Sequence, residues 1–204
     1  LYAWGTARRL RKGPREQVGV PVICIGNINV GGTGKTPTTI ALAQRLGDKG
    51  LSVHVVTRGH GGSLEGPALV EELRHRASDT GDEALLLAAF AKTWVAKDRL
   101  AGARAAAKAG ADVILLDDGF QNPALAHDLS IVVVDAHRGF GNGRVLPAGP
   151  LREPVDVGLA RADAVLSIGP EAAQNRFARD AAQHVTVPIL RGALKPLPTG
   201  LPFE

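Results

Sequence analysis

The amino-acid sequence predicts an α/β fold built on a doubly wound, mostly parallel sheet. Apolar segments rich in β-branched residues alternate along the chain with segments of helical pattern. The apolar segments lack a polar face, which is typical of strands that helices cover on both sides. A glycine-rich turn joins the first of these strands to the first helix. Together these features predict three layers, with the sheet between two layers of helices.

The expected elements follow in chain order from the same pattern. The segments expected as strands are 20–25, 52–57, 93–96, 112–116, 131–134, 164–168 and 185–190. The segments expected as helices are 38–46, 82–92, 99–109 and 171–182. Ligands of such folds bind at the carboxyl ends of the strands. Residues that follow a strand or open a helix there are therefore the first candidates for function.

The composition is that of a soluble globular protein. Of the 204 residues, 45% are hydrophobic and 22% charged, which suits one domain or a domain with part of another. The single cysteine, Cys24, excludes an internal disulfide framework and a cysteine zinc site, and it is expected in the core. No apolar run is long enough to span a bilayer. Met is absent even at position 1, so we interpret the chain as a fragment cut at both ends.

The glycine-rich turn carries a phosphate-binding motif, Gly31-Gly32-Thr33-Gly34-Lys35-Thr36. Glycines allow backbone N–H groups to approach phosphate oxygens without a Cβ between them. The helix N-terminus adds further N–H groups and a partial positive charge. Lys35 is suited to the β- and γ-phosphates, and the Thr36 hydroxyl to Mg²⁺. The sequence therefore predicts a nucleotide site and a three-layer fold like that of P-loop nucleoside triphosphate hydrolases.

The motif departs from the usual pattern at its start. Asn29 stands where a glycine is usual, five positions before Gly34. The double glycine resembles the GGxGK[ST] form of an ATPase branch that includes septum-site and chromosome-partitioning proteins. Those proteins carry a signature lysine where this chain has Val30. The residues expected to contact nucleotide are Asn29, Val30, Gly31, Gly32, Thr33, Gly34, Lys35 and Thr36.

Two adjacent carboxylates, Asp117 and Asp118, follow the apolar strand at 112–116. P-loop enzymes place an Asp at this point to hold Mg²⁺ directly or through water. Successive side chains of a regular strand point to opposite faces, so only one of the two can face a metal at Thr36. Asp117 is the first choice for that role, and Asp118 would then point towards substrate or support the site from behind. The other reading, that the pair only caps a turn, is less favoured with a phosphate loop upstream.

Other polar residues allow more than one interpretation. Asp79, Asp82 and Glu83 surround the start of the helix at 82, and from the residues alone capping is the simpler reading. Arginines near strand ends are suited to bidentate phosphate contact. These arginines are Arg58, Arg99, Arg138, Arg144 and Arg152. The histidines are scattered and show no metal-ligand spacing.

The N-terminal segment combines aromatic and basic residues. Tyr2 and Trp4 precede the cluster formed by Arg8, Arg9, Arg11, Lys12 and Arg15. Such a segment suits an anionic membrane surface, where each basic residue contributes about 1 kcal/mol. Nucleic acid is the other candidate partner of a basic segment, and a solvated helix end is the plain structural reading.

Several stretches of the sequence match one family in order across nearly the whole chain. The chain resembles the tetraacyldisaccharide 4′-kinases of lipid A biosynthesis. The matching stretches are residues 26–37, 57–59, 81–83, 117–121, 138–143 and 146–154. Many ATPases share the phosphate loop, whereas the stretches at 117–121 and 146–154 are far more specific. Asn29 is no departure here, because the family lacks the first glycine of the usual motif.

The resemblance implies ATP- and Mg²⁺-dependent phosphorylation of the 4′-hydroxyl of a tetraacylated glucosamine disaccharide 1-phosphate. It implies that Lys35 and Thr36 hold the phosphates and the metal, and that Asp82 is the general base. Arg99 would help with phosphate charge. The alternative function is a nucleotide-driven switch or assembly ATPase of the GGxGK[ST] branch.

The resemblance also implies a metal and nucleotide site to which Asp117, Asp118 and Glu153 belong. The family pairs its catalytic Asp with a His in the C-terminal part, and no His in this chain matches it. We therefore expect the 204-residue chain alone to bind ATP and to be nearly inactive in transfer.

The resemblance finally implies domains, partners and a location. Residues 1–17 would end a membrane-docking segment, 18–190 would form the kinase domain, and 191–204 would link to a C-terminal part. The expected partners are the lipid A precursor disaccharide and the anionic cytoplasmic face of a Gram-negative inner membrane, to which the protein would bind peripherally. Neither nucleic acid nor an obligate protein partner is expected.

Overall fold

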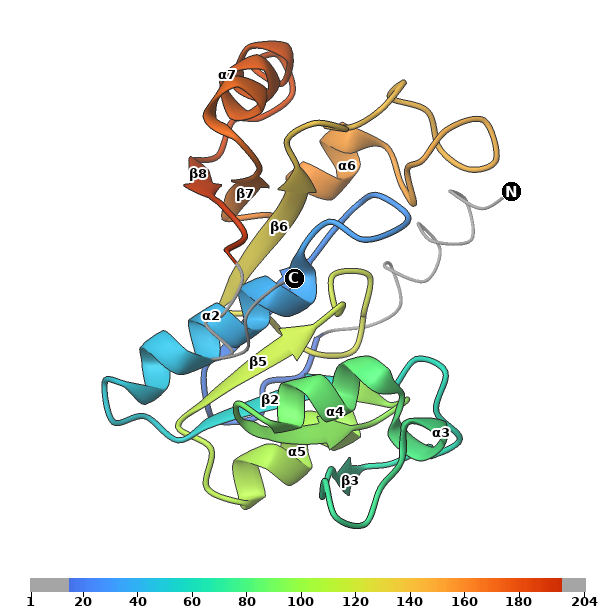
Figure 1. The fold of residues 1–204 in the computed structure, drawn as a ribbon, viewed down its shortest axis with the longest axis vertical. Coiled ribbons are helices and arrows are strands. Elements are labelled where there is room, and N and C mark those ends of the chain that lie inside the picture. The colour runs from blue at the N-terminus through green and yellow to red at the C-terminus, as the bar shows by residue number, and fades with distance from the viewer. Residues whose placement is uncertain (1–14, 196–204) are drawn as a thin grey trace, which may run out of the picture.

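The structure is a computed structural model that describes residues 15–195. The predicted membrane-docking segment lies almost entirely outside the described residues, as does most of the predicted linker at 191–204. Between them the chain forms one eight-stranded sheet with helices on both faces (Figure 1).

The strands and helices alternate along the chain as the sequence predicts. The strands are β1 (Val22–Gly26), β2 (Val53–Thr57), β3 (Ala68–Leu69), β4 (Lys92–Val95), β5 (Val113–Asp117), β6 (Leu129–Asp135), β7 (Ala164–Ile168) and β8 (Ile189–Gly192). The helices are α2 (Lys35–Gly47), α3 (Ala77–Thr80), α4 (Asp82–Ala88), α5 (Arg99–Lys108), α6 (Val155–Leu159) and α7 (Glu171–Asp180).

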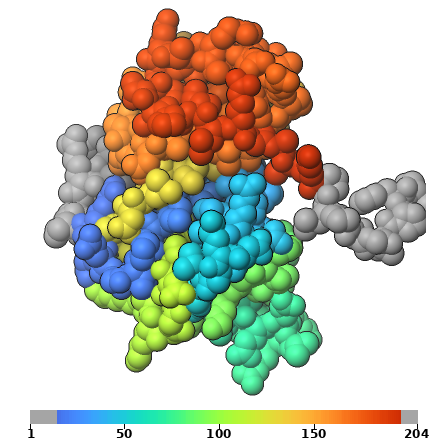
Figure 2. Space-filling model, turned by 90° about the vertical axis from the view of Figure 1, so that its left-hand side faces the viewer, coloured from blue at the N-terminus to red at the C-terminus, as the bar shows by residue number. Residues whose placement is uncertain are grey.

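The sheet has the strand order β3-β4-β2-β5-β1-β6-β7-β8. The pairs are parallel throughout except where β3 runs antiparallel to β4. The chain starts at the centre with β1, builds outwards through β2 and β4, and then crosses to β6, β7 and β8. Figure 1 accordingly shows α7 at one end of the molecule and α3 at the other, and Figure 2 shows the same separation on the surface. This topology confirms the predicted doubly wound, mostly parallel fold.

Two apolar layers fill the space between the sheet and its helices. On one face, Ile25 and Leu115 pack with Ala43 of α2 and Leu87 of α4. On the other face lies the larger cluster, to which α5, α6 and α7 contribute. Its members include Cys24, Leu116, Val132, Leu100, Ala103, Ala106, Leu159 and Phe177. Neighbouring residues of one strand point to opposite layers, and this explains why the strand sequences are apolar throughout.

The boundaries of several elements differ from the predictions. The last strand was expected at 185–190, but β8 is Ile189–Gly192. Pro188 cannot donate to a strand ladder, so it stands before the strand and not inside it. Helix α2 begins at Lys35 and not at position 38, because Pro37 is tolerated within the first turn of a helix. The helix expected to end at 92 stops at Ala88, where a turn leads into β4.

Three short elements were not predicted at all. They are β3 with 2 residues, α3 with 4 and α6 with 5. Segments of this length are too short to show a hydrophobic period, so neighbouring structure decides their conformation. Two of them lie close to functional candidates: α3 is separated from Asp82 by Gly81 alone, and α6 directly follows the 146–154 stretch.

The contact between Gly26 and Phe120 provides a test of the packing at the end of β1. A Cβ built on Gly26 would overlap Cβ of Phe120. Gly26→Ala should therefore lower the free energy of unfolding by about 1–3 kcal/mol through overpacking. Gly47→Ala is the matched control, because no atom lies within 4 Å of its added Cβ, and it should raise stability by up to about 1 kcal/mol. Denaturant unfolding measures both; equal effects would contradict this packing.

Candidate active site

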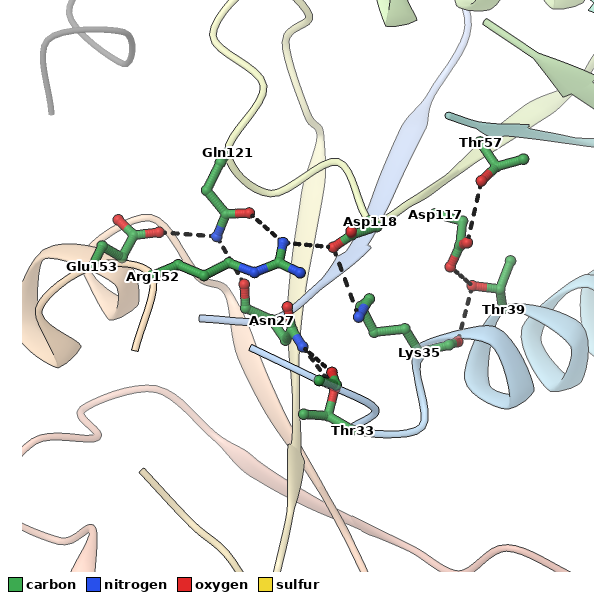
Figure 3. Close-up of polar contacts among 11 residues, drawn as sticks. Asn27, Thr33, Lys35, Thr39, Thr57, Asp117, Asp118, Gln121, Arg152 and Glu153 are labelled. Carbon is green, nitrogen blue, oxygen red and sulfur yellow. Dashed lines mark hydrogen bonds and ion pairs between the residues drawn. The ribbon is translucent and has the colours of Figure 1, made fainter. Parts of the chain in front are cut away.

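The carboxyl ends of β1 and β5 lie side by side and bring two candidate segments together. Ile25 of β1 is opposite Asp117 of β5 in the parallel ladder. The phosphate loop leaves the end of β1, and Asp118 directly follows β5. Figure 3 shows Lys35 at the end of this loop pointing towards Asp118. The pairing of these two central strands thus places the Lys35 ammonium group beside the Asp118 carboxylate at one edge of the sheet.

The phosphate loop enters α2 through glycines in the left-handed conformation. The backbone angle φ is 99° at Gly31 and 93° at Gly34, values that favour glycine. Helix α2 begins directly after Gly34, whose position provides no capping side chain. The N–H groups of the first turn therefore remain available to an anion, with the positive end of the helix dipole behind them.

Asp118 lies between two cations. Its Oδ1 is 3.7 Å from Nζ of Lys35 and accepts a hydrogen bond of 3.1 Å from Nη1 of Arg152. Its φ of 51° is the one positive value recorded for a non-glycine residue in the described chain. The strand has ended at Asp117, so strand alternation no longer decides where Asp118 points. Two cations facing one carboxylate leave a net positive charge beside the loop, as an incoming phosphate requires.

Asp117 is buried behind the loop, with 1% of its surface exposed. Its carboxylate accepts hydrogen bonds from the hydroxyls of Thr39 at 3.2 Å and Thr57 at 3.4 Å. Thr39 lies three residues after Thr36 in α2, and the expected role of Asp117 facing a metal at Thr36 remains a proposal. Burial raises the pKa of Asp117 to about 6, and the negative charges of Glu83 and Asp118 act in the same direction.

Gln121 connects the phosphate loop to the 146–154 stretch. Its Nε2 donates to the backbone oxygen of Asn27 at 2.8 Å and to Oε1 of Glu153 at 3.1 Å. Its Oε1 accepts a hydrogen bond of 3.2 Å from Nη1 of Arg152. Figure 3 shows this chain of contacts running from Glu153 to Lys35. Sequence reasoning assigned no role to Gln121, although it closes one of the two most specific stretches.

Glu153 is placed at the far end of that chain of contacts. It is 2% exposed and forms an ion pair of 2.9 Å with Nη2 of Arg161. The Arg161 guanidinium also lies 4.8 Å from the centre of the Phe120 ring. The structure therefore brings Glu153 to Arg161 and Gln121, and its expected place beside a metal at Thr36 remains a proposal. No sequence signal singled out Arg161, because its partners lie in other segments.

Arg99 opens α5 and is 9% exposed. Its Nη1 donates to the backbone oxygen of Lys97 at 3.1 Å, and within residues 15–195 its Nε has no hydrogen-bond partner. Burial lowers the pKa of Arg99, as does the nearby charge of Arg58, whereas Asp118 and Asp117 oppose the shift. The role of Arg99 towards phosphate charge therefore remains a proposal.

Asp82 is the first residue of α4 and is exposed to solvent. The neighbouring Asp79 acts as a cap, since its Oδ2 accepts a hydrogen bond of 2.8 Å from the Arg76 N–H at the start of α3. Across the part of the chain that is described, the Asp82 side chain makes no such bond. Gly81, with φ of 84°, sets this end of α4 against the backbone of His60. The capping reading thus fits Asp79, while the Asp82 carboxylate stays available.

Cavities flank the phosphate loop on its open side. One, of about 310 Å³, lies against Asn29, Val30 and Pro150. Another, of about 420 Å³, extends over the ends of β6 and β7 past Asp135 and Pro170. Gly32 and Thr33 line both cavities, so free space adjoins this part of the loop.

The described residues contain neither a ready-made metal cluster nor a membrane-spanning helix. No group of three or more His, Cys, Asp or Glu residues there is arranged to hold a metal ion by itself. None of the helices between residues 15 and 195 has the length and apolar character needed to cross a bilayer.

The sheet order, the glycine-rich loop after β1 and the Asp at the end of β5 define a P-loop nucleoside triphosphate-binding protein. Solved structures show the same fold: the signal recognition particle receptor FtsY from Elizabethkingia anophelis matches with a TM-score of 0.52 at 14% identity, over 96% of this chain and 65% of that one. The sequence model of the tetraacyldisaccharide-1-P 4′-kinase family matches residues 1–200. The chain therefore belongs to the tetraacyldisaccharide 4′-kinase family.

Individual relatives agree with that assignment. The chain is 72% identical over 204 residues to a tetraacyldisaccharide 4′-kinase of Jannaschia sp. (strain CCS1), and 66% identical over 205 residues to that of Dinoroseobacter shibae. All of this chain matches, but only 62% and 61% of the relatives' lengths. A structure of LpxK from Aquifex aeolicus, described as an "apo" form in complex with ATP, matches with a TM-score of 0.72 at 23% identity. It covers 97% of this chain and 82% of that one.

The raised pKa of Asp117 predicts how its replacement changes stability with pH. The folded pKa of about 6 lies above the ordinary value of 3.8, so the neutral acid stabilises the fold below pH 3.8 and that stability is lost as pH rises through 6. Asn at this position stays neutral. Between pH 4 and pH 7 the unfolding free energy of Asp117→Asn should therefore gain about 3 kcal/mol relative to the parent protein, from a shift of about two units at about 1.4 kcal/mol each. Urea unfolding at both pH values measures it, and a constant difference would refute the buried-acid description.

Proposed function

We propose that the protein transfers the γ-phosphate of ATP to the 4′-hydroxyl of a tetraacylated glucosamine disaccharide 1-phosphate, in lipid A biosynthesis. Its family membership supports the reaction, and the Lys35–Asp118–Arg152 cluster beside the open α2 N-terminus is the observation that carries it. Because the chain spans about three-fifths of its relatives' length, the activity is proposed for the full-length protein. The Aquifex aeolicus structure with ATP supports the choice of nucleotide.

The proposed ATP site uses the loop from Asn29 to Thr36, with its N–H groups and Lys35 around the β- and γ-phosphates. Magnesium fits the donors present: the Thr36 hydroxyl, Asp117 and Asp118 supply hard oxygen atoms. Mg²⁺ typically takes one or two carboxylates together with phosphate oxygens and water, so a protein cage of three acids is not needed. When bound, the ion would neutralise charge between the β- and γ-phosphates. Glu153 is proposed to support this site.

The proposed transfer is a direct in-line displacement. The sugar hydroxyl oxygen bonds to the γ-phosphorus as the bond from that phosphorus to the bridging oxygen of ADP breaks. Asp82 takes the hydroxyl proton, and its exposed, uncommitted carboxylate supports this role. Lys35 and Arg99 stabilise the charge that moves onto the phosphate oxygens. Positioning and fixed charges then supply most of the rate enhancement.

Membership of the kinase family favours this function over the switch or assembly ATPase. We further propose that residues 1–17 dock the protein on the anionic cytoplasmic face of a Gram-negative inner membrane, that 18–190 form the kinase domain, and that 191–204 lead to a C-terminal part. The basic and aromatic composition of the N-terminal segment supports the docking proposal.

The role of Asp82 predicts a kinetic difference between Asp82 and the nearby Asp79. In the full-length protein, Asp82→Asn should lower kcat by about 10²- to 10⁴-fold, the usual contribution of a general base, while ATP binding measured by calorimetry stays near the parent value. Asp79→Asn is the matched control: it removes the same charge three residues earlier, keeps an oxygen for the α3 cap, and should leave kcat unchanged. Normal turnover by Asp82→Asn would exclude it as the base.

The docking proposal predicts binding to vesicles that contain anionic lipid. Replacing Arg8, Arg9, Arg11 and Lys12 with Gln should release the protein from such vesicles, since each basic residue contributes about 1 kcal/mol near the surface. Co-sedimentation at low and high salt measures the effect, and the parent protein should itself be released by salt. Equal sedimentation of parent and variant would rule out electrostatic docking by this segment.

A further inference from the structure

Asn27 directly follows β1 and is fully buried, although it ends in a polar amide. Its Nδ2 donates hydrogen bonds to the backbone oxygen of Gly31 at 3.3 Å and to Oγ1 of Thr33 at 3.2 Å. Both acceptors belong to the phosphate loop, so one amide spans the base of that loop from the inside. Figure 3 shows the Asn27 side chain reaching Thr33 in this way.

The backbone of Asn27 is itself held in place. Its carbonyl oxygen accepts the 2.8 Å hydrogen bond from Gln121. The preceding residue, Gly26, packs so closely on Phe120 that a Cβ would overlap it. The two hydrogen bonds from the Asn27 amide therefore start from a fixed point at the end of β1. They hold a loop whose glycines have wide conformational freedom.

The orientation of the Asn27 amide follows from its partners. A backbone carbonyl can only accept a hydrogen bond, so the NH₂ group must point towards Gly31 and Oδ1 must point away. In the described part of the chain this Oδ1 is buried and has no hydrogen-bond partner. Leaving a buried acceptor unpaired costs free energy. Asn27 thus holds the loop through its NH₂ group while its buried Oδ1 stays unpaired. An apolar residue of similar size would avoid the cost of that unpaired oxygen but could not hold the loop.

We infer that Asn27 is a positioning residue for nucleotide: it fixes the path of Gly31 to Thr33 so that the loop N–H groups converge on the phosphates before nucleotide arrives. The inference rests on the proposed function only in taking the anion to be the phosphate chain of ATP or ADP. Preorganised donors bind more tightly because no ordering of the loop has to accompany binding.

This role differs measurably from a general role in folding. A loss of folded protein lowers the amount of active enzyme and hence the apparent kcat, but it leaves KM unchanged. A loosened phosphate loop raises KM for ATP and the Kd for ADP, while KM for the lipid acceptor stays the same.

The test compares Asn27→Ala and Asn27→Asp in the full-length protein. Asn27→Ala should raise KM for ATP and Kd for ADP about tenfold, with little change in KM for the lipid. Asn27→Asp should raise them further, because its carboxylate faces two oxygen acceptors where the NH₂ group was. Asp128→Ala is the matched control: it removes a 2.8 Å side-chain brace to the N–H of Val22 at the other end of β1, and it should lower thermal stability without changing KM for ATP.

Thr33 keeps the inference testable if the Asn27 variants fail to fold. Thr33→Val retains the shape of the side chain but removes the hydroxyl acceptor, and it should raise KM for ATP in the same direction, whereas Thr33→Ser, which keeps the hydroxyl, should raise it less than Thr33→Val does. Unchanged KM for ATP in Asn27→Ala or Thr33→Val would overturn the inference even if transfer by the parent protein is normal. Absence of transfer by a parent protein that binds ADP would overturn the proposed function and leave the role of Asn27 standing.

Discussion

The parallel pairing of β1 with β5 is the constraint on which the functional region depends. The register that sets Ile25 beside Asp117 also sets the phosphate loop beside Asp118, because both segments leave the sheet at the same edge. Several side chains of the candidate site come from this edge: Lys35 from the loop, Arg152 and Gln121 from the segments that follow β6 and β5, and Thr57 from the end of β2. The apolar strands matter for function because they align these ends.

The adjacent acids Asp117 and Asp118 differ in burial and in the charges around them. Asp117 is closed off behind α2, with a pKa of about 6, and the hydroxyls of Thr39 and Thr57 are its partners. Asp118 is partly exposed and already neutralised by Lys35 and Arg152. Phosphate and Mg²⁺ would compete for both partnerships: phosphate would draw Lys35 away from Asp118, and the metal would favour the charged form of Asp117. The contacts that hold this site together are thus ones that ligands can exchange.

Sequence reasoning found the fold and the loop but not the contacts between segments. The strand pattern and the glycine-rich turn follow from local rules, so the longer strands and helices were predicted in their order with end residues displaced, whereas the short β3, α3 and α6 were missed. The last strand, β8, was misplaced because Pro188 was read as part of it. Two contacts depend on how helices pack against the sheet: the hydrogen bond between Asp117 and Thr39 and the ion pair between Glu153 and Arg161. Neither has a local sequence signal, and only the structure could show them.

In the proposed reaction, the phosphate held by this loop passes to a lipid hydroxyl and not to water. The most direct measurement is ³¹P NMR of the products formed by the full-length protein from Mg²⁺-ATP and the tetraacylated disaccharide 1-phosphate. The expected products are ADP and a new phosphomonoester at the 4′-position, while the 1-phosphate signal stays in place. Release of inorganic phosphate with an unaltered disaccharide would contradict the proposed reaction and would favour a nucleotide-driven switch.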